Sequence, residues 1–350
     1  MSYIKKVEIN KLFGELDINW SLDPKVNILI GKNGSGKTTL LRLFRNFIMS
    51  SHGQFISRNL IDSIRIEFDD DKYIYAAQDS EAMSQLFSNK SSEQRHEQAM
   101  NKLLPSHVVY KTQSNIFPQK KEIPFSDVIN LCYINTFEIS HEDFDVSESY
   151  KAQNGVNTEL DVVLKHLMND WKSYLLKVKI LAEKATSFFD EKIMDISSKE
   201  SADENDFQEL KKLLNEKTEK IDDIHFYKNR FIGQINTLFA DSKKRIDFDK
   251  NNAIIFRNRN GKSFSVYELS SGEKQMLIIL LNVLIQENKP SIILMDEPEI
   301  SLHLAWQLDL IDIIQSLNNN CQLIIVTHAA GVFNKGWKDK ITKMVDITTR

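Results

Sequence analysis

Hydrophobic residues follow an alternating pattern at both ends of the chain. Short apolar runs predict β-strands, and they alternate with longer segments whose apolar residues recur at helical spacing. In the first part, the predicted strands are residues 4–9, 18–20, 26–30, 63–68, 72–76 and 128–134, and a helix covers residues 40–48. After residue 250, the predicted strands are 253–256, 264–266, 292–295 and 323–326, and the predicted helices are 273–285 and 302–317. This order of elements is typical of an α/β fold.

The middle of the chain, from residue 158 to residue 240, predicts a long antiparallel helical hairpin. Apolar residues recur at helical spacing on both sides of a polar segment, residues 197–206, which places the tip near residue 200. Neither glycine nor proline occurs between residues 156 and 232. Two arrangements fit this pattern: a subdomain packed on the core, and a projecting coiled-coil arm. The imperfect heptads favour the packed subdomain.

The two α/β stretches flank the hairpin, which suggests that both contribute to one site. We expect an N-terminal part of the head at residues 1–140, a helical insertion or lid at 141–245, and a C-terminal part at 246–350. The polar residues 79–102 predict an exposed helix or loop.

Composition restricts the class of protein. The chain has 350 residues with 11 glycines, 6 prolines and 41% hydrophobic residues, which excludes collagen-like, proline-rich and generally disordered chains. Its net charge of −4 provides no overall positive field toward nucleic acid or anionic lipid. The Lys-rich stretches 217–220 and 243–245 are candidates for phosphate contacts, but interspersed acidic residues favour a solvated helix face.

The two cysteines and the chain's apolar stretches indicate the cellular compartment. Cys132 and Cys321 lie far apart without metal or redox spacing, which predicts reduced core residues. The N-terminal residues show no secretory signal, and the longest apolar stretches, such as residues 276–281, are too short to span a membrane. We therefore expect a cytoplasmic protein without a membrane partner.

Three of the eleven glycines lie within six residues, directly after the predicted strand 26–30. Residues 31–38, GKNGSGKT, match the GxxxxGK[ST] phosphate-binding loop between a strand and a helix. The glycines let backbone N–H groups surround a phosphate, and the helix N-terminus adds further donors. This motif predicts ATP and Mg²⁺ as cofactors, with Lys37 on the β- and γ-phosphates and Thr38 on the metal. The predicted nucleotide-binding residues are Asn33, Gly34, Ser35, Gly36, Lys37, Thr38 and Thr39.

A second candidate for phosphate binding lies much later in the chain. Residues 269–275, LSSGEKQ, resemble the LSGGQ signature of ABC-type ATPases, in the variant found in chromosome-maintenance and repair ATPases. By this resemblance Ser270, Ser271 and Gly272 would contact the γ-phosphate held by the opposite subunit, so that two heads enclose two ATP molecules. Ser271 replaces the family's first glycine and Glu273 its glutamine. Taken alone, the segment also fits an ordinary helix cap.

Two further motifs follow in the order typical of ABC-type ATPases. Residues 292–299, IILMDEPE, resemble a Walker B strand, which makes Asp296 a Mg²⁺ ligand and Glu297 the base that polarises water. Residues 301–303 resemble the D-loop, with a structural role for its histidine. Residues 323–328, LIIVTH, end in His328, which in the family contacts the γ-phosphate and senses its loss. The predicted catalytic residues are therefore Lys37, Glu297 and His328.

These motifs together resemble an ABC-type ATPase of the SMC, RecF and OLD class. The resemblance implies a P-loop NTPase head with a mixed sheet, flanking helices and a helical-hairpin insertion. It is nearest to stand-alone ATPases of bacterial anti-phage systems of the PARIS and Septu type. The family's Q-loop glutamine is not assigned, since Gln78 and Gln113 are both candidates and residues 133–136 occupy a suitable position without one. Phe13 is a candidate for stacking on adenine.

The resemblance implies a Mg²⁺-dependent, ATP-hydrolysing switch that dimerises around ATP or forms a higher oligomer. Such a switch would control a separately encoded effector, for example a nuclease or toxin. A RecF-like repair ATPase that acts directly on DNA is the main alternative. A third is a scaffold that binds ATP and hardly turns it over.

Overall fold

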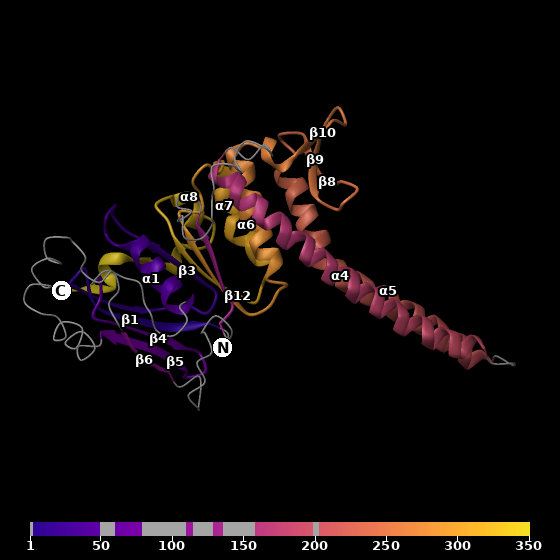
Figure 1. Ribbon diagram of the computed structural model, residues 1–350, viewed down its shortest axis with the longest axis horizontal. Helices are drawn as coiled ribbons and strands as arrows, with labels where there is room; N and C mark the ends of the chain where they lie inside the picture. The colour runs from indigo at the N-terminus through magenta and orange to yellow at the C-terminus, as the bar shows by residue number, and fades with distance from the viewer. Residues whose placement is uncertain (1–2, 50–59, 79–109, 115–128, 136–157, 199–202) are drawn as a thin grey trace, which may run out of the picture. The chain divides into compact units, whose positions relative to one another are not determined.

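The computed structural model describes residues 3–49, 60–78, 110–114, 129–135, 158–198 and 203–350 (Figure 1). The predicted polar element at 79–102 lies outside these residues. The chain divides into two compact units. The first consists of Met1–Glu138, Lys289–Ile311 and Asn319–Arg350, and the second of Ile139–Asn288 and Asp312–Asn318.

The first unit contains an antiparallel and a parallel sheet. The antiparallel sheet has the order β14-β2-β1-β4-β5-β6. Its strands are β1 (Ile4–Leu12), β2 (Leu16–Ser21), β4 (Ser63–Phe68), β5 (Tyr73–Gln78), β6 (Tyr110–Ser114) and β14 (Thr348–Thr349). The parallel sheet has the order β13-β3-β12-β11-β7. Its strands are β3 (Val26–Ile30), β7 (Leu131–Asn135), β11 (Ser291–Asp296), β12 (Cys321–Val326) and β13 (Ile341–Lys343).

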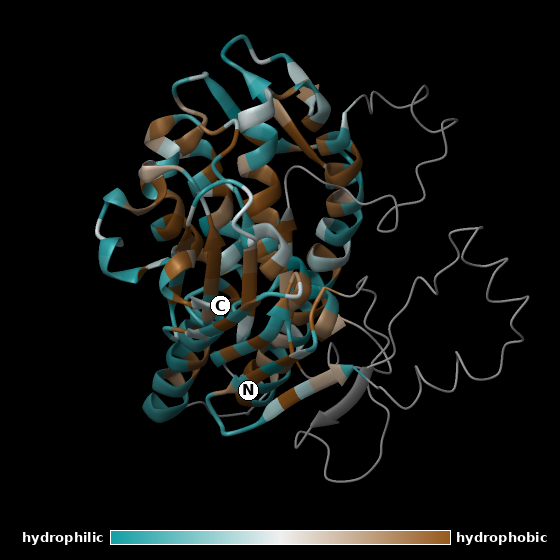
Figure 2. Ribbon diagram, turned by 90° about the vertical axis from the view of Figure 1, so that its left-hand side faces the viewer, coloured by the Kyte–Doolittle hydropathy of each residue, from teal (hydrophilic) through white to brown (hydrophobic). Residues whose placement is uncertain are grey.

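The parallel strands are apolar because both faces of their sheet are covered. All six residues of β11 and all six of β12 are buried, and Figure 2 shows the hydrophobic colour concentrated on these strands. Helix α1 (Lys37–Met49) buries one side between the sheets, where Leu40, Phe44 and Phe47 join the core. Short elements α7 (Leu304–Leu317) and α8 (Ala330–Asn334) follow β11 and β12.

Cys132 in β7 and Cys321 in β12 are buried and form no disulfide, as predicted. Burial raises the pKa of both thiols to about 12, so they stay protonated and unreactive at neutral pH. Within the described residues, no helix combines the length and hydrophobicity needed to cross a lipid bilayer.

The second unit contains the predicted helical hairpin. Its helices are α4 (Glu159–Ser197) and α5 (Glu204–Leu238), and each begins with a complete capping box, Thr158 with Asp161 and Asp203 with Asp206. The unit also has helix α6 (Ser271–Ile285) and a small antiparallel sheet of order β10-β9-β8. Its strands are β8 (Lys244–Phe248), β9 (Ile254–Asn258) and β10 (Ser263–Ser265). The predicted α/β fold with a hairpin insertion is therefore confirmed.

The hairpin packs differently from the expected subdomain. At its base, Trp171 is fully buried and lies 5.7 Å from the Phe248 ring and 5.9 Å from the Phe231 ring. Among the described residues from 179 to 230, however, only Phe189 and Leu213 are buried. The two helices extend together beyond the base (Figure 1). The packed-subdomain interpretation is wrong for this distal part, because within the described residues no third layer covers the apolar side chains there.

The signature segment, residues 269–275, belongs to the same compact unit as the hairpin. The predicted boundaries, which followed the order of motifs, grouped it with the Walker B strand instead. Those boundaries stay a prediction.

Candidate nucleotide-binding site

The phosphate-binding loop connects β3 to α1 within the first unit. Gly34 has φ +76° and Gly36 has φ +92°, a conformation that residues with a Cβ rarely adopt. A Cβ on Gly36 would also lie 3.1 Å from Cε2 of Phe13. The backbone at these positions therefore requires glycine, as the sequence motif predicts.

Lys37 is the first residue of α1 and is 5% exposed. Its Nζ donates to the carbonyl oxygens of Gly31 and Lys32 at 3.1 and 3.2 Å. The same Nζ lies 2.7 Å from Nε2 of His328. Burial lowers the pKa of Lys37, while the charges of Glu297 and Asp296 oppose that shift. The ammonium group is thus held at the mouth of the loop, where a phosphate would meet it.

The carboxyl ends of β11 and β12 lie side by side because these strands are parallel, with Asp296 opposite Val326. The hydroxyl of Thr38 donates to Oδ1 of Asp296 at 3.1 Å. Burial raises the pKa of Asp296, and the bond from Thr38 opposes that shift. A hydroxyl oxygen and a carboxylate oxygen from two elements thus meet at one point. Such oxygen ligands fit Mg²⁺, which usually takes one or two protein ligands besides waters and phosphates.

Glu297 follows β11 in a left-handed conformation, with φ +48°. Its backbone N–H donates to the Val326 carbonyl at 2.9 Å, and its Oε2 accepts from the His328 N–H at 3.1 Å. Non-glycine residues adopt this backbone only where surrounding bonds enforce it, often at functional sites. Burial, a hydrogen bond with the Glu299 side chain and the charge of Glu299 raise the pKa of Glu297 to about 8. A carboxyl group with such a pKa suits a general base near neutral pH.

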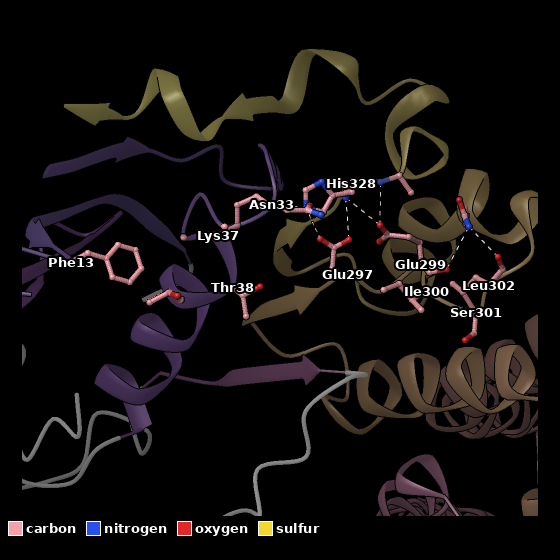
Figure 3. A pocket seen from close by; sticks show the side chains of 15 residues that line it. Phe13, Asn33, Lys37, Thr38, Glu297, Glu299, Ile300, Ser301, Leu302 and His328 are labelled. Atoms are coloured by element: carbon pink, nitrogen blue, oxygen red, sulfur yellow. Dashed lines mark hydrogen bonds and ion pairs between the residues drawn. The ribbon is translucent and has the colours of Figure 1, made fainter. Parts of the chain in front are cut away.

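His328 lies just after β12, between Lys37 and Glu297 (Figure 3). Its Nε2 is 3.3 Å from Oε1 of Glu297. Burial, followed by the charge of Lys37, lowers the pKa of His328 and favours the neutral imidazole. A neutral ring can accept from Lys37 through Nε2, with its proton on Nδ1. His328 therefore contacts both of the other predicted catalytic residues, Lys37 and Glu297.

A pocket of about 1160 Å³ opens over these groups. Figure 3 shows the Phe13 ring at one end and residues 299–302 at the other. The predicted residues that line the pocket are Asn33, Gly34, Gly36, Lys37, Thr38, Thr39, Glu297 and His328, and Phe13 lines it too. Ser35 lies elsewhere, on a neighbouring pocket of about 940 Å³, and its buried hydroxyl has no hydrogen-bond partner among the described residues. The Ser35 side chain therefore does not line the pocket that the other predicted residues form.

The signature residues occupy the start of α6 in the second unit. Ser270 is the N-cap: its hydroxyl accepts from the Glu273 N–H, and its own N–H donates to the Glu273 carboxylate at 2.9 Å. Glu273 also accepts from Lys244 at 2.6 Å and from Ser242 at 2.8 Å. The contacts of this segment among the described residues are thus those of an ordinary helix N-cap, which is one of the two interpretations of the sequence. The glutamate that replaces the family's glutamine serves as the partner in the capping box.

The candidate Q-loop residue Gln78 is not part of the pocket lining. The Gln78 side chain donates to the Ile61 carbonyl at 3.3 Å, and Gln113 lies on β6 opposite Tyr75. Asn135 lies opposite Asp296 in the parallel sheet, at the end of β7. His303 has the expected structural role, since its Nδ1 accepts from the Ala305 N–H at 3.3 Å.

Two polar side chains of the pocket, Glu299 and Gln307, were not predicted as functional. Glu299 accepts hydrogen bonds from the loop that carries His328, and Gln307 donates to the Leu302 carbonyl at 3.0 Å. Glu299 is visible in the sequence only as the last letter of DEPE, where the motif gives it no chemistry.

Comparison with known proteins places the chain in a family. The sequence profile described as an AAA ATPase domain matches residues 3–332. The chain belongs to this AAA ATPase domain family. Among curated relatives, it is similar to a protein of Vibrio cholerae serotype O1 biovar El Tor named "Retron Vc95 probable ATPase". The two are 24% identical over 364 residues, which cover 91% of this chain and 68% of the relative.

Similar solved structures are heads of SMC proteins. The Pyrococcus furiosus Smc head bound to the C-terminal domain of ScpA is 15% identical, covers 98% of this chain and 96% of its own, and has a TM-score of 0.46. The Thermotoga maritima SMC head is 13% identical, with 95% and 91% coverage and a TM-score of 0.45. Taken with the motif order, the family and the retron relative confirm the resemblance of this AAA ATPase domain to ABC-type ATPases of the SMC, RecF and OLD class.

Proposed function

We propose that this AAA ATPase domain binds ATP with Mg²⁺ in the pocket of the first unit and hydrolyses it. The observation that carries this proposal is the contact of Lys37 with His328, and of His328 with Glu297, beside the paired oxygens of Thr38 and Asp296. These groups come from the loop after β3 and from the ends of β11 and β12. Family membership supports ATPase activity, and the geometry supports the roles of individual residues.

Each group has a role that follows from its chemistry. The backbone of residues 33–39 would surround the phosphates, and Lys37 would bind the β- and γ-phosphates. Thr38 and Asp296 would hold Mg²⁺, which supplies charge stabilisation to the transferring phosphoryl group. Glu297 would take a proton from the attacking water, and His328 would contact the γ-phosphate from the neighbouring strand.

Two variants test this function. Lys37→Ala should abolish binding of a fluorescent ATP analogue, whereas Glu297→Gln should bind it and lose hydrolysis. We expect kcat of the glutamine variant to fall by about 100-fold or more, because a general base typically contributes about 10²–10⁴-fold. A wild-type rate in Glu297→Gln would disprove the assignment of the base.

We also propose that the signature residues Ser270, Ser271 and Gly272 complete the site of a second copy, so that two chains enclose ATP. The capped start of α6 supports this role, since backbone N–H groups at a helix N-terminus bind anions. ATP added to Glu297→Gln should convert monomers to dimers in light scattering after gel filtration. Ser270→Arg should prevent that dimer without lowering the affinity of the monomer for ATP.

The biological role that we propose is that of a switch in an anti-phage system, controlling a separately encoded effector such as a nuclease or toxin. Similarity to a retron probable ATPase supports this proposal. Affinity purification of the tagged native protein, followed by mass spectrometry, tests it. Recovery of a stoichiometric nuclease or toxin is the expected result, and purification of the chain alone would argue against a stable effector complex.

Direct action on DNA is a second candidate, and one observation favours it. A hollow of about 700 Å³ at the end of α5 is lined by Lys243, Arg245 and Arg259, and none of its lining residues is acidic. Within the described residues, these three cations form no ion pair. Duplex DNA should then bind with an affinity that falls steeply with salt. Arg245→Glu with Arg259→Glu should abolish that binding, and Lys211→Glu on the distal hairpin should not.

A further inference from the structure

Glu299 is the third carboxylate after β11, and it is 5% exposed. Its Oε1 accepts from the Thr327 hydroxyl and from the backbone N–H groups of His328 at 3.3 Å and Ala329 at 3.2 Å. Figure 3 shows the carboxylate facing this backbone rather than solvent. Three donors of one short loop therefore converge on a single oxygen.

The loop that supplies these donors is the one that carries His328. Thr327 is fully buried, and its N–H donates to the Leu29 carbonyl of β3 at 3.2 Å. Its hydroxyl also accepts from the Ala329 N–H at 2.9 Å. The loop is thus attached to the strand before the phosphate-binding loop on one side and to Glu299 on the other.

Stability alone does not account for a glutamate at this position. A buried carboxylate is costly unless it is fully hydrogen-bonded. Oε2 of Glu299 is buried without a nitrogen or hydroxyl donor among the described residues, and the side-chain hydrogen bond between Glu299 and Glu297 forms only when one of the two carboxyl groups is protonated. A side chain that served only packing would be apolar, so the charge-assisted bonds to the loop must serve another purpose.

We propose that Glu299 is a positioning residue that fixes residues 327–329 so that the His328 ring lies between Lys37 and Glu297. This inference rests on the proposed ATPase function of the same pocket. The His328 ring lies 2.7 Å from Lys37 Nζ and 3.3 Å from Glu297 Oε1. Without the anchor, the loop would gain freedom and the ring would leave this position for part of the time.

Steady-state ATPase assays test the proposal with four proteins: wild type, Glu299→Ala, His328→Ala and the double variant. Glu299→Ala should lower kcat by about 10- to 100-fold and change KM by less than about 3-fold, because binding groups stay in place. The double variant should be no slower than His328→Ala, since the anchor acts only through the histidine. Glu299→Gln should restore most of the rate, because its amide oxygen can accept the same bonds. Losses that multiply in the double variant would overturn the proposal.

Hydrogen exchange provides a readout that does not depend on hydrolysis. The amides of His328 and Ala329 should exchange about 10-fold faster or more in Glu299→Ala, because they lose their acceptor. Asp309→Ala, which removes a surface carboxylate paired with Lys335, is the matched control and should leave both amides unchanged. If Glu299→Ala unfolds, Thr327→Val can take its place, because it removes one of the three donors to Glu299. This variant should show a smaller fall in kcat and a smaller rise in amide exchange than those expected for Glu299→Ala.

These readouts separate the two proposals. A wild-type protein without ATPase activity would refute the proposed function, while faster exchange in Glu299→Ala would still support the anchor. If the wild type is active and the His328 and Ala329 amides exchange at the same rate in Glu299→Ala, the proposed role of Glu299 is refuted while the proposed function stands.

Discussion

Replacement of Glu273 by glutamine should destabilise the second unit, although glutamine is the residue that the family signature has. Glu273 is 4% exposed and accepts from Lys244, Ser242 and the Ser270 N–H. Hydrogen bonds to charged groups contribute about 1.5–3 kcal/mol, and an N-cap contributes about 1 kcal/mol. Glutamine keeps an acceptor oxygen for the cap, and Lys244 can turn toward solvent. We therefore expect a loss of about 2 kcal/mol.

The pH dependence of this loss follows from the pKa of Glu273. Burial alone would raise that pKa, but the bonds from Lys244, Ser270 and Ser242 outweigh it, so the folded pKa lies below the ordinary value of 4.5. A carboxyl group with a lowered pKa stabilises the fold above its unfolded pKa and ceases to do so as the pH falls through the folded pKa. The difference in free energy of unfolding between wild type and Glu273→Gln should thus be constant from about pH 7 to pH 5 and become smaller below about pH 4.5.

Urea unfolding followed by the fluorescence of Trp171, which lies in the same unit, measures this difference at each pH. Glu268→Gln is the matched control, because Glu268 belongs to an exposed capping box with Ser265. Its effect should stay within about 0.5 kcal/mol at every pH. A Glu273→Gln loss that persists unchanged at about pH 3.5, or that narrows as the pH rises, would refute the reasoning.

Three further predictions follow from the packing and the loops. Trp171→Ala should lower the free energy of unfolding in urea by about 3–5 kcal/mol, because it removes the buried centre of the hairpin base. As a control, Phe207→Ala should change that free energy by less than about 0.5 kcal/mol, since Phe207 is 67% exposed. Gly36→Ala should keep the fold in circular dichroism but weaken ATP binding by about 10-fold or more, because φ +92° disfavours a Cβ. Asp161→Asn should lower the free energy of unfolding by about 3 kcal/mol. The reason is that the Lys274 side chain, which is only 9% exposed, loses the carboxylate that lies 2.7 Å from its ammonium group. An unchanged free energy of unfolding in this variant would contradict the prediction.

The parallel strands and the phosphate-binding loop could be predicted because each depends on short-range patterns. Strand β3 was predicted to its last residue, since a fully buried parallel strand is a continuous apolar run. Strand β8 was missed because three of its five residues, KRIDF, are charged and only Ile246 is buried. The short strands β13 and β14 have too few apolar residues to give any pattern.

The contacts around the site depend on chain segments that the sequence separates widely. Lys37 was predicted to bind phosphate, but its contact with His328, 291 positions later, follows only from the order of strands in the parallel sheet. Glu299 had no predicted role because two of its three partners are backbone N–H groups about 30 residues away, which have no residue-type signal. Sequence motifs thus identified the chemical groups, whereas the fold determines which of them touch.

The hairpin insertion and the signature helix are best understood as one structural element. Two consecutive residues near the start of α6 are held by different parts of the insertion: Glu273 by Lys244 at the start of β8, and Lys274 by Asp161 in the first turn of α4. Both contacts are largely buried ion pairs, so α6 cannot shift along its axis without breaking one of them. The distal hairpin, by contrast, has almost no buried side chains of its own. Shortening the hairpin beyond its base should therefore preserve the signature, whereas any change that moves the base of α4 will move the residues that we propose to contact a second nucleotide.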